Sequence, residues 1–202
     1  MSYAWRVPTL WTDTIETHRR QVHDAILDTT AALAEEHGVL AVTMSQIAKR
    51  TGIGRATLYK YFASVEEILH AWHDRQVRTH LAQLRTIHDN DRPVADRLTA
   101  FLTTYADIQS QRHDHSTSAH GHELAALLHR HDRIAPAERE LHTLLRDLLT
   151  QAATTGHVRR DIPAAELATF CLYALDAAHD LPSKAAVQRL ARLTNAAILP
   201  RD

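Results

Sequence analysis

Residues 43–62, TMSQIAKRTGIGRATLYKYF, concentrate side chains that donate hydrogen bonds to anions. No Asp or Glu stands between Glu36 and Glu66. The same stretch holds four basic residues: Lys49, Arg50, Arg55 and Lys60. Four basic minus no acidic residues gives a local charge of +4, whereas the whole chain of 202 residues has a net charge of −1. Because a local positive field attracts phosphate, the pattern predicts a small nucleic-acid-binding element in a chain that is not basic overall.

Two short helices joined by a tight turn would position these donors. Thr43 and Gln46 have the spacing of a capping box before a helix over 44–50. Gly52 suits a turn residue with positive φ before a second helix that ends near residue 61. Apolar residues that would hold the two helices together are Ile47, Ala48, Ile53, Leu58 and Phe62. This is the pattern of a helix-turn-helix, whose second helix enters the major groove by its first turn, where Arg55 lies. A solvated helical hairpin with a chance charge bias is the alternative.

The segment IAKRTGIGRATLYKYFASVEEIL resembles the DNA-binding signature of TetR-family regulators, and the resemblance covers residues 26–69. It implies a DNA-binding domain, placed at 17–63, and a ligand-binding and dimerisation domain over 64–202. It also implies that Thr43, Tyr59 and Tyr61 touch phosphates, and that Arg55 and Lys60 contact bases or the groove. Val65 stands where the family often has Lys, which places that phosphate contact in question. The expected DNA-binding residues are Thr43, Ser45, Gln46, Arg55, Ala56, Thr57, Tyr59, Lys60 and Tyr61.

The whole chain is predicted to be all-α, with about nine helices. Pro and Gly fall where the apolar periods break, and no alternating Val/Ile/Thr run suggests a strand. Besides the helix-turn-helix, helices are expected at 17–37, 64–88, 93–112, 119–131, 136–155, 164–178 and 183–199. Ser64 and Glu67 have the spacing of a second capping box. The polar, His-rich segment 111–122 is expected to be a loop.

Composition limits the class of protein. Apolar residues make up 45% and charged residues 23%, which are ordinary globular values. Cys171 stands alone and cannot form an intramolecular disulfide, and no stretch approaches the length of a membrane span. We therefore expect a cytoplasmic protein that does not contact a membrane. No catalytic signature or phosphate-binding loop is present, so neither an enzyme nor a cofactor is expected.

The chain has sixteen histidines, which could indicate a metal-binding function. Three His-x-His pairs lie at 113/115, 120/122 and 129/131. Residues two apart point to different faces of a helix, so a solvated polar corner is favoured over a Zn²⁺ or Ni²⁺ site, and no metal ligand is assigned. A metal-sensing regulator stays open as an alternative. An all-α metal-dependent enzyme is a more distant one, because it leaves the basic segment unexplained.

The resemblance implies that the last two helices form a two-fold dimer and that the fourth helix borders a ligand pocket. Ala174 and Ala178 would allow close approach beside Leu167, Phe170 and Cys171. A second apolar face is formed by Val187, Leu190, Thr194, Ala197 and Ile198. Packing of both helices on their own core is the alternative. The expected ligand-binding residues are His73, Val77, His80, Phe101, Tyr105 and Ile108. The alternative is that the histidines lie at the edge of the core with hydrogen-bond partners and that the other residues are plain core.

Together these features predict a homodimeric regulator that binds a palindromic operator in double-stranded DNA. A small-molecule inducer would shift the population towards a conformation whose two second helices no longer match adjacent major grooves. The predicted regulator is therefore a repressor.

Overall fold

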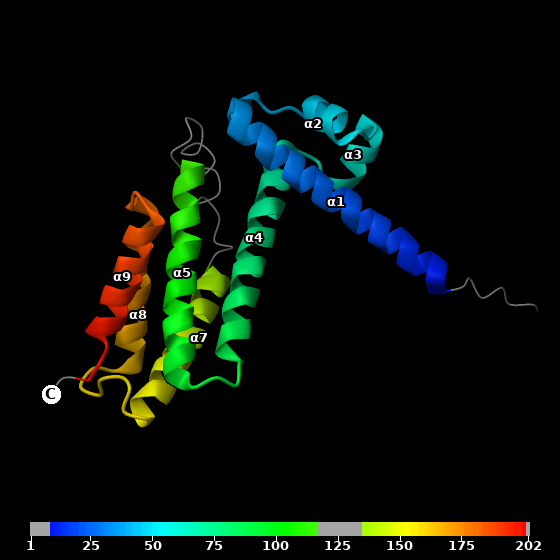
Figure 1. Cartoon of the computed structure of the whole chain (residues 1–202). Coiled ribbons are helices and arrows are strands. Elements are labelled where there is room, and N and C mark those ends of the chain that lie inside the picture. Colours follow the sequence, from blue (N-terminus) through cyan, green and yellow to red (C-terminus); the bar gives the residue numbers. More distant parts are fainter. Residues whose placement is uncertain (1–8, 117–134, 201–202) are drawn as a thin grey trace, which may run out of the picture. The chain divides into compact units, whose positions relative to one another are not determined.

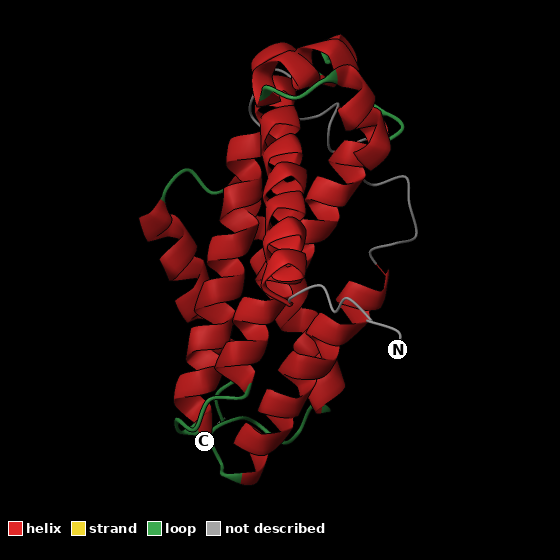
Figure 2. Cartoon of the chain, turned by 90° about the vertical axis from the view of Figure 1, so that its right-hand side faces the viewer, coloured by secondary structure: helices red, strands yellow, loops and turns green. Residues whose placement is uncertain are grey.

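The computed structural model describes residues 9–116 and 135–200, and within these ranges every regular element is a helix (Figures 1 and 2). The elements are α1 (Thr9–His37), the 3-10 turn η1 (Val39–Ala41), α2 (Met44–Thr51), α3 (Arg55–Tyr61), α4 (Val65–His88), α5 (Val94–Ser116), α7 (Ala135–Thr154), α8 (Ala164–Asp176), the 3-10 turn η2 (Ala177–Asp180) and α9 (Lys184–Ala197). The all-α prediction is confirmed. The helix expected at 119–131 lies outside the described residues.

The chain divides into two compact units, Met1–Asp74 and Arg75–Asp202. The division falls inside α4, whereas the sequence placed a domain boundary at 63/64. Because α4 continues across the division without a break, its first turns belong to the first unit and the rest to the second.

The first unit is built around the long helix α1. This helix begins at Thr9, earlier than the expected residue 17, because neither Gly nor Pro interrupts the chain between Pro8 and Gly38. It ends before Gly38, whose φ of 87° is the left-handed region that L side chains rarely adopt. The core of the unit consists of fully buried side chains from α1 to α4: Ile26, Leu27, Ile47, Leu58, Ile68 and Leu69.

The second unit packs α5, α7, α8 and α9 around a continuous apolar core. Phe101 and Leu102 of α5 are buried against Leu145, Leu148 and Leu149 of α7. Leu145, Leu148 and Leu149 are spaced i, i+3 and i+4, as are Leu98, Phe101 and Leu102, so one face of each helix is removed from water. Arg85 of α4 forms an ion pair with Glu140 of α7, which ties the second half of α4 to this unit.

Two local predictions are corrected. The segment expected as a loop from residue 111 is helical as far as Ser116, since α5 continues through the first His-x-His pair. At the start of α4, Ser64 Oγ accepts a hydrogen bond from the Glu67 N–H at 3.2 Å as expected. However, the Glu67 carboxylate accepts from the N–H of Ala63, at 2.7 Å, and not from that of Ser64. None of the described helices combines the length and the apolar character needed to cross a bilayer.

Candidate nucleic-acid interface

The turn between α2 and α3 has the geometry that the sequence predicted. Thr43 closes a capping box with Gln46 at the start of α2, and Gly52 after α2 has φ 72° and ψ 19°. The Gly52 N–H donates to the carbonyl of Ala48, so the left-handed residue ends α2 and redirects the chain. Ile47, Ala48 and Leu58 are buried between the helices, which fixes α3 against α2.

The outer surface of this pair of helices carries the donors that were singled out. Arg55, Ala56, Thr57, Tyr59 and Lys60 are exposed on α3, and Tyr61 is half-buried. Thr43, Ser45, Gln46 and Lys49 are exposed at and on α2. Among the side chains that the structure describes, no acidic group lies within ion-pairing distance of Lys49, Arg55 or Lys60. These three cations therefore face solvent with their charges uncompensated, which is the state that phosphate binding requires.

Arg50 does not contribute to that surface as the charge count suggested. Its guanidinium donates two hydrogen bonds to the Glu36 carboxylate, at 2.5 and 2.7 Å, and so joins the end of α2 to the end of α1. The hydrogen bond from Arg50 holds the pKa of Glu36 below its ordinary value, and the same bond raises the pKa of Arg50. The positive surface of α2 and α3 thus rests on three cations and not on four.

Thr43 and Gln46 are committed to capping. The Thr43 hydroxyl donates to Gln46 Oε1 at 2.7 Å and accepts from the Gln46 N–H at 3.3 Å. Gln46 Oε1 also accepts from the Thr43 N–H at 2.8 Å. In this arrangement the Thr43 hydroxyl hydrogen can reach a phosphate only by leaving Gln46. Contacts from these two residues to DNA stay predictions, as do those of the other residues named from the sequence.

The residues named for a ligand pocket occupy three kinds of environment. His73 is half-buried in the first unit, and Val77 and His80 are half-buried on the part of α4 in the second unit. Phe101 and Ile108 are buried in the core of the second unit. Tyr105 packs at its edge, and its hydroxyl accepts a hydrogen bond from Gln109 at 3.0 Å. The structure brings the three α5 side chains together as core, and their role in ligand binding stays a prediction.

A hollow of about 540 Å³ lies elsewhere in the second unit, between the end of α7 and the start of α8. Its wall includes Leu149, Val158, Ile162 and Leu167, with Arg159 and Arg160 at its polar side. Arg159 is buried and pairs with Asp161, while Arg160 donates to the carbonyls of Ala153 and Thr154 at the end of α7. Sequence reasoning did not find this hollow, because the residues that line it carry no motif.

No group of three potential metal ligands gathers among the described side chains. The pairs at 120/122 and 129/131 lie outside the described residues, and of the pair at 113/115 only the helical backbone is described. The metal-sensing alternative stays a prediction.

The faces of α8 and α9 differ from the expected ones. Val187, Thr194 and Ile198 are buried in their own unit, as are Leu167, Cys171 and Ala178, so packing on their own core accounts for these side chains. Leu190 and Ala174 are half-buried, and Ala197 is exposed. The large apolar side chains of α8 and α9 that face solvent are Phe170, Tyr173 and Leu193, exposed to 46%, 78% and 68%. Tyr173 and Leu193 were missed, although Phe170 and Tyr173 have the i, i+3 spacing that places both on one side of a helix.

Comparison with known proteins agrees with this architecture. Residues 26–72 match the family described as "Bacterial regulatory proteins, tetR family". A 65-residue part of the chain is 42% identical to a protein of Mycobacterium tuberculosis named as the mycofactocin biosynthesis transcriptional regulator MftR. That match spans 32% of this chain and 31% of the relative, so it concerns less than a third of either protein.

Solved structures of other proteins resemble most of the chain, and two of them serve as examples. A TetR/AcrR-family transcriptional regulator from Thermobifida fusca has a TM-score of 0.67 at 20% identity, over 86% of this chain and 96% of that one. SmeT, the repressor of a Stenotrophomonas maltophilia multidrug efflux pump, has a TM-score of 0.66 at 21% identity, over 88% and 90% of the two chains. SmeT has also been solved with triclosan. At these identities the structures establish a shared fold for both units.

Proposed function

We propose that the chain is a transcriptional regulator of the TetR type and a repressor that binds operator DNA through α2 and α3, because residues 26–72 match the tetR family of bacterial regulatory proteins. The observation that carries the proposal is the three-cation surface of Lys49, Arg55 and Lys60. These side chains stand on a helix-turn-helix and lack acidic partners among the described residues, in a chain whose net charge is −1.

Within this surface, the position of each residue on α3 would decide whether it contacts a base or a phosphate. Arg55 is the first residue of α3 and is exposed, so it can present its planar guanidinium to the edge of a guanine in the major groove. Tyr59 and Lys60 lie one turn further along, where donors to phosphate would fix the register of the helix on the duplex. Thr57 and Ser45 would add short-range contacts of the same kind.

The exposed apolar face of α8 and α9 supports a homodimer. Large apolar areas are exposed on Phe170, Tyr173 and Leu193. Burial of this surface against a second copy would stabilise the dimer by roughly 25 cal/mol for each Å² removed from water. A two-fold dimer would present two copies of α3 to a palindromic operator, which a single copy would contact too little to specify. The face proposed here replaces the one expected from the sequence, since most of that one lies in the core.

A small molecule would then control operator binding. A ligand that binds one conformation of the second unit better than another shifts the population by that difference in affinity. The candidate lining residues remain those named from the sequence on α4 and α5, from His73 to Ile108. SmeT, a repressor with the same fold, has been solved with triclosan, which supports an organic ligand over a metal ion.

The DNA-binding proposal is tested by selecting a binding sequence from a random duplex library and measuring affinity for it at fixed salt. Arg55→Ala is expected to cost ~1–3 kcal/mol and to relax the preference at one base pair. Arg55→Lys keeps the charge but loses the bidentate geometry, so it is expected to relax the same preference while the salt dependence stays as in the wild type. If the library yields no preferred sequence, or if Arg55→Ala selects the same sequence with unchanged affinity, the proposal is wrong.

The dimer is tested by light scattering without DNA. Tyr173→Glu with Leu193→Glu is expected to give monomers and to weaken binding to the selected palindrome. Glu substitutions at Thr86 and Thr143, exposed positions on the second-unit part of α4 and on α7, serve as the matched control. A dimer that persists in the α8 and α9 double variant would show that another face forms the interface.

A further inference from the structure

Two arginines on the first half of α1 have no place in the surface described above. Arg19 and Arg20 are exposed, and no acidic group among the described side chains lies within ion-pairing distance of either guanidinium. Glu16, one turn before them, is exposed and does not pair with them, and Asp24 lies beside the His23 ring at 3.6 Å. Arg20 makes only a long contact of 3.4 Å with the hydroxyl of Thr17. Both positive charges therefore remain available to a partner.

The side of α1 on which they lie is fixed by a ring contact. The His23 ring packs on Phe62, with centroids 5.1 Å apart, and Phe62 is the residue that directly follows α3. Residues three and four apart share one side of a helix, so Arg20 and Arg19 lie on the same side of α1 as His23, one turn towards its N-terminus. They therefore lie on the side that faces the end of α3.

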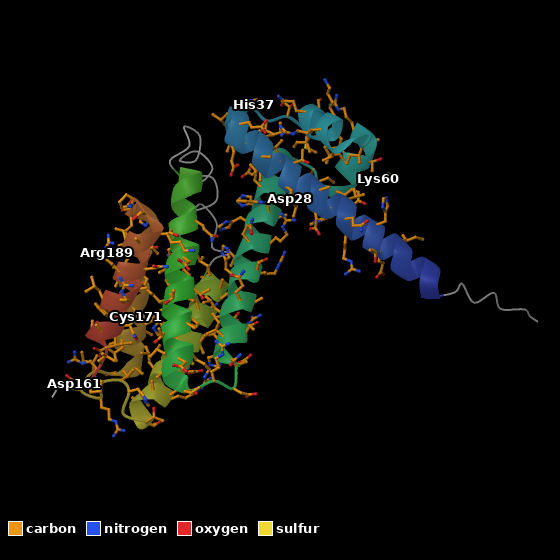
Figure 3. The ribbon with its side chains drawn as sticks, in the orientation of Figure 1. Asp28, His37, Lys60, Asp161, Cys171 and Arg189 are labelled. Atoms are coloured by element: carbon orange, nitrogen blue, oxygen red, sulfur yellow. The ribbon has the colours of Figure 1, made fainter. Side chains whose placement is uncertain are left out.

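That end of α3 belongs to the DNA-binding surface. Lys60 and Tyr61 occupy the last turn of α3, and Figure 3 shows Lys60 at this end of the helix, near α1. In Figure 1 α1 continues past α3 towards Thr9. The positive surface thus does not stop at α3 but extends along α1 by at least one further turn.

We propose that Arg19 and Arg20 form a second phosphate-binding element, which contacts the backbone of duplex DNA beyond the base pairs read by α3. The proposal rests on the DNA-binding function proposed above. Duplex DNA carries one charge per ~1.7 Å of its axis, so a wider cationic surface meets additional phosphates along the same strand. Because phosphates carry no sequence information, this element adds affinity and salt dependence without changing the preferred sequence.

The experiment uses the full-length protein and a mixed-sequence DNA duplex, whose binding depends on phosphates alone. Affinity is measured between 50 and 200 mM salt for the wild type and for Arg19→Gln/Arg20→Gln. With about 0.9 in the salt slope for each phosphate contact, loss of two contacts lowers the slope by about 1.8 for each subunit. Between 50 and 200 mM salt, the binding constant of the wild type is then expected to fall by a factor that is about 12 times larger, per subunit, than the factor for the variant.

Two further variants separate the possible outcomes. Arg92→Gln/Arg139→Gln removes the same charge from exposed positions of the second unit and is expected to keep the slope of the wild type. Arg55→Gln/Lys60→Gln removes charge from α3 and tests the DNA-binding function itself. If the α3 variant loses affinity while Arg19→Gln/Arg20→Gln keeps the slope of the wild type, the α1 element is refuted and the proposed function stands.

If all three variants bind like the wild type, or if the wild type does not bind the duplex even at 50 mM salt, both proposals fail. An equal loss of slope in the Arg92/Arg139 control would mean that overall charge, and not position on α1, governs binding, which also overturns the α1 element. Unfolding followed by tryptophan fluorescence checks that the exposed α1 substitutions leave the first unit folded. In that check the variant is expected to match the wild type.

Discussion

Gly52 sets the angle between α2 and α3, and substituting it should destabilise the first unit through the backbone alone. Its φ of 72° is strained for any L side chain, and a Cβ built there meets no atom within 4 Å. Gly52→Ala therefore causes no clash. A left-handed Ala costs about 1–2 kcal/mol, and the reduced freedom of the unfolded chain returns about 0.4–1 kcal/mol. We expect a net loss of about 1 kcal/mol in the free energy of unfolding.

The tryptophans allow this loss to be measured in the first unit alone. Trp5, Trp11 and Trp72 all precede the division after Asp74, so fluorescence during urea denaturation follows the first unit in the intact chain. Two companion variants test the cause. Gly52→Asn should lose less than Gly52→Ala, because Asn tolerates the left-handed region better. Gly54→Ala should stay near the wild type, because Gly54 has a φ of −67° and the new Cβ would meet Thr57 Oγ1 at an ordinary 3.8 Å.

At Gly54 the entropic gain of Ala is offset by its weakness as an N-cap residue, which leaves a change near zero. The reasoning is refuted if Gly52→Ala unfolds at the urea concentration of the wild type. It is also refuted if Gly52→Asn is destabilised more than Gly52→Ala, because the loss would then follow side-chain size and not backbone conformation.

Two further predictions concern titratable groups. Arg50 lowers the pKa of Glu36, so this carboxylate stabilises the fold above its unfolded pKa of roughly 4.3, and the contribution is lost as the pH falls through the lowered folded pKa. In Glu36→Gln, the free energy of unfolding, followed by tryptophan fluorescence, should therefore fall less steeply as the pH is lowered than in the wild type. An equally steep fall at acid pH would contradict this. Burial raises the pKa of the Cys171 thiol to about 12, so the native protein should resist a thiol reagent at pH 8 and react fully in denaturant (Figure 3). Rapid modification of the native protein would show that α8 opens more readily than its packing implies.

Much of the first unit could be predicted from the sequence because its determinants are local. The capping box of Thr43 and Gln46 spans four residues, and Gly52 stands directly after the helix that it ends. Such signals depend on hydrogen bonds within one turn, and the structure places them as expected. The start of α1 at Thr9 was missed, although Trp11 and Ile15 have the i, i+4 spacing of a helix and nothing in residues 9–16 stops one.

The faces of α8 and α9 could not be predicted in the same way. α8 is apolar around much of its circumference, so periodicity alone does not tell which of its stripes faces the core. α9 has one apolar stripe, and periodicity alone does not tell whether that stripe faces its own core or a second copy. Packing against α5 and α7 buries Leu167, Cys171 and Val187, and it leaves Tyr173 and Leu193 in solvent. The choice between the stripes depends on contacts between helices that are distant in the sequence.

The charge of the DNA-binding surface illustrates the same limit for function. The sequence between Glu36 and Glu66 contains four cations. However, Glu36 itself forms an ion pair with Arg50, fourteen positions later, and neutralises its charge. The fold also brings Arg19 and Arg20, which the count left out, to the side of α1 that faces the end of α3. The sequence therefore locates the positive element and three of its cations, but its count includes Arg50, which is paired with Glu36, and leaves out Arg19 and Arg20. Phosphate binding depends on which cations lack a partner on one face, and only the folded chain decides that.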